Sequence, residues 1–222
     1  DADCIIRPLP HSSHLVSITP RKSGKNYWIE CNDNFRQCFI HLPACRTETP
    51  APENETNFVL NNFLMMLYAF NAARHHTLLM HASVVATETG KSTHTGLWLQ
   101  QFSDCHLLND DNPIVHVDSL GKQATVFGSP WSGKTPCYRK ESMTVGAFVR
   151  LEQAPQNEIE QERAAHAFAT LLPSCSCLKQ NKEIYNAIVT TVTELATLAP
   201  VYHLKCLPDR EATELCRKTV EG

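Results

Sequence analysis

The chain has 222 residues, which suits one domain of ordinary size or one domain with a small appendage and rules out two large domains. Its 20 basic and 23 acidic residues give a formal net charge of −3, so the chain lacks the overall positive field that grips a phosphate backbone. We therefore expect no nucleic-acid partner. Hydrophobic residues make up 42% of the chain and charged residues 19%, which is typical of a packed, enzyme-like domain rather than a disordered chain.

No stretch of the sequence predicts a membrane span. The longest apolar region, residues 58–73, is interrupted by Asn61 and Asn62 and predicts a buried helix instead. The ten cysteines are scattered, several of them within apolar runs, which favours reduced thiols. The closest pair, Cys175 and Cys177, has no second paired element at metal spacing, so no structural zinc is predicted. Since the first residues also show no export signal, we expect a cytoplasmic protein without a membrane partner.

The amino-terminal region predicts a small separate unit. Residues 1–46 alternate apolar and polar positions, as at 15–19 and 27–31, with turn residues between them, which predicts an antiparallel β unit. Residues 47–56 carry prolines and glutamates and predict an exposed connection. A second domain, residues 57–222, then begins with a helix, because its apolar residues recur at helical spacing.

The second domain predicts an α/β fold. Apolar runs predict strands at 78–85, 106–109, 114–117, 125–127, 145–151 and 201–207, and helices are predicted at 157–171, 180–199 and 209–218. We expect one mixed, twisted sheet with flanking helices and with a phosphate loop at the carboxyl end of a strand, where ligands of such sheets bind.

The first motif that could carry chemistry is Gly90-Lys91-Ser92-Thr93, the second half of a Walker A loop. In that loop backbone N–H groups close on phosphate oxygens, the lysine neutralises phosphate charge and the hydroxyl binds magnesium. The first half of the motif is missing, because Val85 stands where the motif has glycine. An ordinary helix start fits the same four residues, so both interpretations stay open.

Paired carboxylates provide the second element. Asp110 and Asp111 follow an apolar strand downstream of Lys91, where a magnesium-binding acid and a general base belong. A polar turn is the alternative, since residues 109–113 are all turn formers. His81 lies in an apolar run, where a histidine of the core is the alternative to a functional one.

A third segment, residues 128–135, places two glycines, hydroxyl side chains and Lys134 in a row, which can present donors to an anion. Lys134 could then act as a second phosphate clamp, and the alternative is a surface loop anchored by Trp131. Further along, Arg150 at a strand end is the basic side chain we expect to neutralise the charge of a transferred phosphate.

Together these segments resemble HPr serine kinase/phosphorylase, a family related in its nucleotide-binding core to phosphoenolpyruvate carboxykinase, and more closely an HPr-kinase-like branch of it. The resemblance covers roughly residues 55–215. It rests on Met80-His81-Ala82-Ser83-Val84-Val85, Gly90-Lys91-Ser92-Thr93-His94, Leu107-Leu108-Asn109-Asp110-Asp111, Gly128-Ser129-Pro130-Trp131-Ser132-Gly133-Lys134-Thr135-Pro136, Val145-Gly146-Ala147-Phe148-Val149-Arg150-Leu151, Leu171-Leu172-Pro173-Ser174-Cys175 and Leu207-Pro208-Asp209-Arg210.

The resemblance implies a kinase core with ATP and Mg²⁺ as cofactors. In it Lys91 binds phosphates, Ser92 and Asp111 hold magnesium, Asp110 is the base toward a substrate hydroxyl, and His81 sits near the γ-phosphate. We therefore expect ATP-dependent phosphoryl transfer to a protein serine or to a small molecule.

Two other functions are kept as alternatives. A nucleotide-sensing or peptide-binding module would retain the nucleotide site without the chemistry, and a shortened Walker loop would favour it. Decarboxylation of the carboxykinase type ranks last, because the further metal-binding and carboxylate-binding groups that it needs are not found in the sequence. A homo-oligomer stays open at this point.

Overall fold

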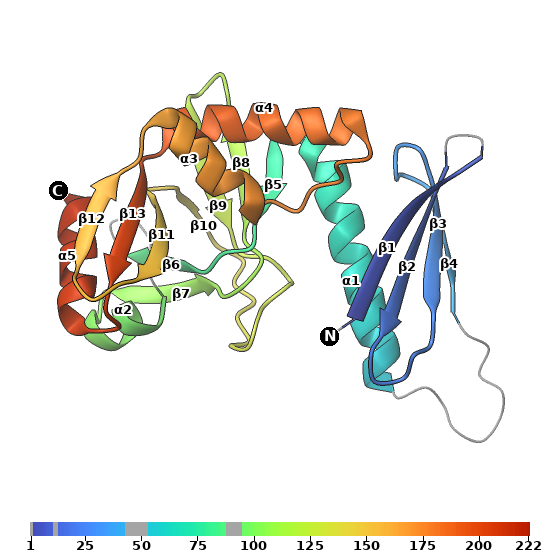
Figure 1. Cartoon of the computed structure of the whole chain (residues 1–222), viewed down its shortest axis with the longest axis horizontal. Coiled ribbons are helices and arrows are strands. Elements are labelled where there is room, and N and C mark those ends of the chain that lie inside the picture. Colours follow the sequence, from blue (N-terminus) through green and yellow to red (C-terminus); the bar gives the residue numbers. More distant parts are fainter. Residues whose placement is uncertain (1, 11–12, 43–52, 88–94) are drawn as a thin grey trace. The chain divides into compact units, whose positions relative to one another are not determined.

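The structure is a computed structural model that describes residues 2–10, 13–42, 53–87 and 95–222 (Figure 1). The chain divides into two compact units, Asp1–Asn71 and Ala72–Gly222.

The first unit contains one antiparallel sheet in the order β1-β2-β3-β4. Its strands are β1 (Ala2–Leu9), β2 (Ser13–Pro20), β3 (Tyr27–Asn32) and β4 (Cys38–His41). Alternate residues of the middle strands are buried, as at Val16 and Ile18 on β2 and at Tyr27 and Ile29 on β3. This period of two gives the sheet one apolar face, as an antiparallel sheet covered on one side requires.

Helix α1 (Glu53–Ala72) supplies the apolar partner of this sheet. Its residues Val59, Phe63 and Phe70 are buried, and the ring of Phe70 lies edge-on to that of Phe35, with 5.1 Å between the ring centroids. The Tyr27 hydroxyl donates a 2.7 Å hydrogen bond to the Glu55 carboxylate. Helix and sheet therefore share one small core.

The described residues of the second unit form three sheets. One is antiparallel in the order β10-β9-β8-β5 and consists of β5 (Thr77–Leu79), β8 (Ile114–Asp118), β9 (Gln123–Phe127) and β10 (Ser142–Thr144). The antiparallel pair β6 (Val84–Thr87) and β7 (Cys105–Asn109) forms another. In the third, β13 (Val201–Cys206) lies between the parallel β11 (Phe148–Gln153) and the antiparallel β12 (Glu158–Gln161).

The predicted single mixed, twisted sheet is therefore wrong, because the described residues form four separate and mostly antiparallel sheets. The apolar run 78–85, which we predicted as one strand, explains much of the difference. It breaks after β5, where the backbone N–H groups of Met80, His81 and Ala82 donate to the carbonyls of Pro113, Ser174 and Asp111 at 3.1, 2.6 and 3.0 Å. Asp111 and Pro113 lie in the turn between β7 and β8, whereas Ser174 lies far along the chain. Residues 80–82 therefore leave the pairing of β5, and β6 begins in a different sheet.

The helices of the second unit are α2 (Thr95–Gln101), α3 (Ala164–Leu171), α4 (Lys182–Leu198) and α5 (Arg210–Glu221), with short 3-10 helices η1 (Ala73–His75) and η2 (Leu172–Ser174). The predicted α4 is confirmed, and its apolar face is buried at Ile184, Ile188, Val192 and Leu195. The Asp209 cap is confirmed as well, because its carboxylate accepts from the Ala212 N–H at 2.9 Å.

The predicted helix 157–171 is wrong in its first half. Residues Glu158–Gln161 form β12, in which each residue pairs with one of β13, and the helix begins only at Ala164. None of the helices in the described ranges is both long and apolar enough to cross a bilayer.

Candidate functional site

Asn109, the last residue of β7, organises the turn that carries the two aspartates. Its side chain is fully buried. The amide oxygen accepts from the backbone N–H groups of Asp111 and Asn112 at 2.9 and 2.8 Å. The amide nitrogen donates to the Ser129 hydroxyl at 3.1 Å and to the Trp131 carbonyl at 3.2 Å. This one side chain thus shapes the aspartate turn and ties it to the segment at 128–136.

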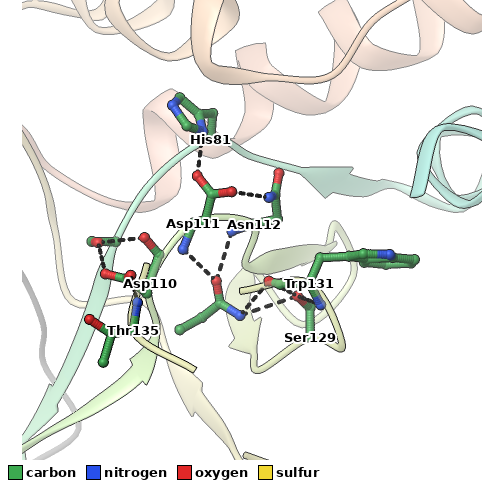
Figure 2. Close-up of polar contacts among 9 residues, drawn as sticks. His81, Asp110, Asp111, Asn112, Ser129, Trp131 and Thr135 are labelled. Atoms are coloured by element: carbon green, nitrogen blue, oxygen red, sulfur yellow. Dashed lines mark hydrogen bonds and ion pairs between the residues drawn. The ribbon is translucent and has the colours of Figure 1, made fainter. Parts of the chain in front are cut away.

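Asp111 projects from this turn toward His81 (Figure 2). The imidazole Nδ1 of His81 lies 2.9 Å from Asp111 Oδ1, and the Asn112 amide donates to Asp111 Oδ2 at 2.7 Å. The side chain of His81 is 80% exposed, whereas that of Asp111 is 31% exposed. His81 therefore faces solvent, and the alternative of a histidine of the core is wrong.

Asp110 points to the other side of the turn. Its Oδ2 accepts from the Thr135 N–H at 2.9 Å, and its Oδ1 lies 3.3 Å from the Ser83 hydroxyl. The same hydroxyl donates to the Asp110 carbonyl at 2.9 Å. Two separate segments, one before β6 and one at 128–136, thus hold this carboxylate in a fixed orientation.

The segment 128–136 needs its glycines for steric reasons. A Cβ on Gly133 would lie 3.0 Å from Asp110 Oδ2 and 3.1 Å from Asp111 Cβ, and a Cβ on Gly128 would lie 2.1 Å from the Arg139 carbonyl oxygen. A side chain at Gly128 would therefore clash with the backbone, and one at Gly133 would require the aspartates to shift by a few tenths of an ångström. Lys134, which follows Gly133, is exposed.

Beside the aspartates lies a cavity of about 350 Å³ within the second unit. His81, Ser83 and Arg150 are among its lining residues, so it reaches the side chains that contact Asp111 and Asp110. Arg150, on β11, forms an ion pair with Glu152 at 3.2 Å. Among the described residues Arg150 contacts neither aspartate directly, and it joins the group only through this cavity.

The structure thus brings His81, Asp110 and Asp111 together and places Lys134 one residue from the Thr135 N–H that binds Asp110. The predicted phosphate loop lies outside the described residues, and with it the predicted ligands Gly90, Lys91, Ser92 and Thr93.

Sequence reasoning did not assign roles to Ser83, Asn109 or Thr135. Asn109 had a signal, since asparagine at the start of a turn bonds backbone N–H groups two and three residues on. The contacts of Ser83 and Thr135 join residues 25 or more positions apart, and no local pattern indicates them.

A magnesium ion fits these residues only in part. Mg²⁺ is commonly bound by one or two carboxylates together with substrate phosphates and waters. Asp111 provides such a carboxylate, and its partner His81 is exposed enough to move aside. Within the described ranges no group of three or more His, Cys, Asp or Glu side chains could hold a metal ion by itself. The remaining ligands would have to come from the nucleotide and from Ser92.

Comparisons with protein-family models, with curated proteins and with solved structures found no match for this chain. The resemblance to HPr serine kinase/phosphorylase therefore stays a prediction from the sequence motifs.

Proposed function

We propose that the protein is an ATP- and Mg²⁺-dependent phosphotransferase that phosphorylates a hydroxyl group of a protein serine or of a small molecule. The observation that carries this proposal is the convergence of His81, Asp110 and Asp111. His81 comes from the segment after β5 and the two aspartates from the turn after β7, yet they lie together at one end of β7 beside a cavity. A phosphate, its metal and a base must meet within a few ångströms, and such a cluster supports that arrangement.

Asp110 is the proposed general base. Its Oδ2 accepts from the Thr135 N–H, and its Oδ1 lies 3.3 Å from the Ser83 hydroxyl, whose single proton is shared with the Asp110 carbonyl at 2.9 Å. Both carboxylate oxygens therefore keep lone pairs for a further donor. A carboxylate in a fixed position can accept the proton of an acceptor hydroxyl as that hydroxyl attacks the γ-phosphate. Asp110 would therefore orient the acceptor as well as deprotonate it.

The nucleotide would be bound by the remaining predicted residues. Lys91 and Lys134 would neutralise the phosphates, Gly90 and Thr93 would contribute backbone and hydroxyl donors, and Ser92 with Asp111 would hold the metal. Bound Mg²⁺ neutralises charge on the phosphates. His81, held by Asp111, would face the γ-phosphate, and Arg150 would offset negative charge on a substrate in the cavity.

The cytoplasm is the compartment we propose. None of the nine cysteines within the described ranges forms a disulfide. Reduced thiols persist in reducing compartments, where ATP is also available.

A nucleotide-sensing or peptide-binding module is the second candidate. It is favoured by one observation: all four carboxylate oxygens of Asp110 and Asp111 already lie within bonding distance of a protein donor. An aspartate turn that serves only to shape the backbone would look the same. The two candidates differ in transfer and not in nucleotide binding.

The test combines calorimetry for ATP with Mg²⁺ and a phosphoryl-transfer assay on a panel of proteins and small alcohols. Lys91→Ala should lose binding and transfer together. Asp110→Asn should change nucleotide affinity by less than about tenfold and lower transfer by roughly 10²-fold or more.

Asp118→Asn is the matched control, because the Asp118 carboxylate, like that of Asp110, accepts from backbone N–H groups beside a turn, but it stands at the end of β8 and does not line the cavity. It should leave transfer unchanged. A parent protein that binds nucleotide but transfers no phosphate would favour the second candidate, and one that binds no nucleotide would overturn both.

A further inference from the structure

The cavity of the second unit has the size and lining of a ligand site. Its volume is about 350 Å³, at the lower end of the range of roughly 300–1,000 Å³ seen for small-molecule sites. Well-packed interiors hold few voids larger than a water molecule, so a void of this size is not an ordinary packing defect.

The walls of this cavity are mainly apolar and come from several sheets. Met80, Val84, Leu108, Val126, Met143 and Phe148 are among the lining residues. They belong to β6, β7, β9, β10, β11 and the segment after β5, all in the second unit (Figure 1). Water gains little in an apolar space because it needs two to four polar partners there. An apolar body of matching size should therefore displace it favourably.

The lining of the cavity includes one permanently charged side chain, Arg150. Among the described lining residues Arg150 is the only arginine or lysine, and none is aspartate or glutamate. The ion pair of Arg150 uses one terminal nitrogen toward Glu152, and a guanidinium has five N–H donors. The Glu152 carboxylate is 48% exposed and is shared with His203 at 2.9 Å, so it does not saturate the guanidinium.

The cavity is also reachable from solvent. Its wall includes Arg150, whose side chain is 50% exposed, and His81, whose side chain is 80% exposed. A ligand can therefore enter with its charged end next to the guanidinium.

We propose that this cavity binds a small apolar carboxylate, with its hydrocarbon part between the sheets and its carboxylate on Arg150. The volume corresponds to about twelve liquid water molecules, which allows a ligand of about ten non-hydrogen atoms such as octanoate. Binding does not depend on the proposed phosphotransferase activity. If that activity holds, a hydroxylated member of this class is the acceptor, since Ser83 lines the cavity and also contacts Asp110.

The first experiment measures binding of octanoate and of octan-1-ol by calorimetry, with no nucleotide present. The two probes share the apolar body and differ in charge. Octanoate should bind about tenfold more tightly, the scale of one charge-assisted contact. Arg150→Gln should remove that difference and leave octan-1-ol binding unchanged.

The chain offers a close control for this variant. Arg139 pairs with Glu141 at 3.2 Å, and His106 approaches the same carboxylate at 2.9 Å, which matches the contacts of Arg150 with Glu152 and His203. Arg139 does not line the cavity. Arg139→Gln should therefore keep the preference for octanoate.

The second experiment locates the ligand without any substitution. Of the four methionines, Met80 and Met143 line the cavity, whereas Met65 and Met66 lie on α1. In protein labelled with ¹³C at the methionine methyl groups, octanoate should shift the Met80 and Met143 signals and leave the other two in place.

Several results would overturn this proposal. Absence of octanoate binding to the parent protein would do so, as would equal affinity for the two probes or equal loss in Arg139→Gln and Arg150→Gln. Shifts of Met65 and Met66 alone would place the ligand elsewhere.

An extended apolar peptide that shifts the Met80 and Met143 signals when octanoate does not would assign the cavity to a peptide partner. Octanoate binding in a protein that transfers no phosphate would leave this proposal standing and refute only the phosphotransferase.

Discussion

Two carboxylates of the second unit each pair with a basic side chain, yet their surroundings differ. Asp104 meets Arg217 through two contacts, at 2.6 and 3.0 Å, and the Arg217 side chain is 23% exposed. Asp111 meets His81 through one contact at 2.9 Å, and the His81 side chain is 80% exposed. The first pair is fixed by its neighbours, whereas the second remains open to solvent.

The packing around Arg217 explains this difference. Its guanidinium carbon lies 4.3 Å from the Phe102 ring centroid and 5.9 Å from that of Trp98, which is fully buried in the apolar cluster shared by α2, β13 and α5. Arg217 Nε also donates to the Glu221 carboxylate at 3.0 Å. An arginine held by ring faces and by these two carboxylates stabilises the fold. An exposed single contact contributes little to stability. We infer that the His81 and Asp111 pair is placed for a ligand, and that stability at this turn comes from the buried side chain behind it.

The largest expected effect tests that buried side chain. Asn109→Ala removes four hydrogen bonds and leaves the backbone N–H groups of Asp111 and Asn112 without the acceptor that shapes the turn. The free energy of unfolding should fall by about 2–4 kcal/mol. Urea unfolding measures it, and a loss below about 0.5 kcal/mol would show that the turn holds its shape without Asn109.

A somewhat smaller loss is expected at the packed ion pair. Arg217→Met keeps much of the apolar contact with Phe102 but leaves Asp104 without its bidentate partner, so unfolding should become easier by about 1–3 kcal/mol. Arg210→Met is the control, because Arg210 forms an exposed pair with Glu214 on the same helix, and it should change stability by less than about 0.5 kcal/mol. Equal effects of the two variants would contradict the comparison.

The pH dependence of stability tests the contribution of the ion pair between Asp104 and Arg217. Hydrogen bonds from Arg217 lower the pKa of the Asp104 carboxyl below its ordinary value. A carboxyl with a lowered pKa stabilises the fold above its unfolded-state pKa, and that contribution is lost as the pH falls through the folded-state pKa. Asp104→Asn should therefore lower the melting temperature at neutral pH, and the gap to the parent protein should narrow in acid. A gap that stays constant down to about pH 2 would argue against this pair as its source.

The smallest effect is expected at the exposed pair. His81→Ala should change the free energy of unfolding by less than about 0.5 kcal/mol, because a single contact of an exposed side chain is largely screened by solvent. Chemical denaturation at neutral pH measures it. A loss above about 1.5 kcal/mol would place His81 among the structural residues and remove the contrast with Arg217.

Sequence patterns predicted much of the local structure. Periodic apolar positions indicated α1 and α4, Asp209 indicated the start of α5, and alternation indicated the antiparallel sheet of the first unit. These features depend on residues close in sequence. The sheet arrangement of the second unit could not be predicted in this way, because an apolar strand such as β6 does not specify its partner. The contacts that split residues 78–85 come from Pro113, Ser174 and Asp111.

The candidate site shows the same limit. The residue types at Asp110, Asp111 and His81 indicated chemistry, and the structure places them together. Their exposure and orientation depend on Asn109, Ser83 and Thr135, whose contacts cross between segments. The half-motif at residues 90–93 lies outside the described residues, so its relation to the aspartates stays a prediction.

The proposed phosphotransferase site requires that nucleotide phosphates and their metal bind beside His81. Mn²⁺ can replace Mg²⁺ with ATP, and its unpaired electrons broaden nearby proton signals in NMR spectra. The His81 imidazole signal, assigned by its loss in His81→Gln, should broaden when Mn²⁺ and ATP are added together, and Asp111→Asn should weaken that broadening. The His106 and His203 signals, from imidazoles paired with Glu141 and Glu152, serve as internal references. A His81 signal that stays sharp while calorimetry records bound nucleotide would contradict the proposed site.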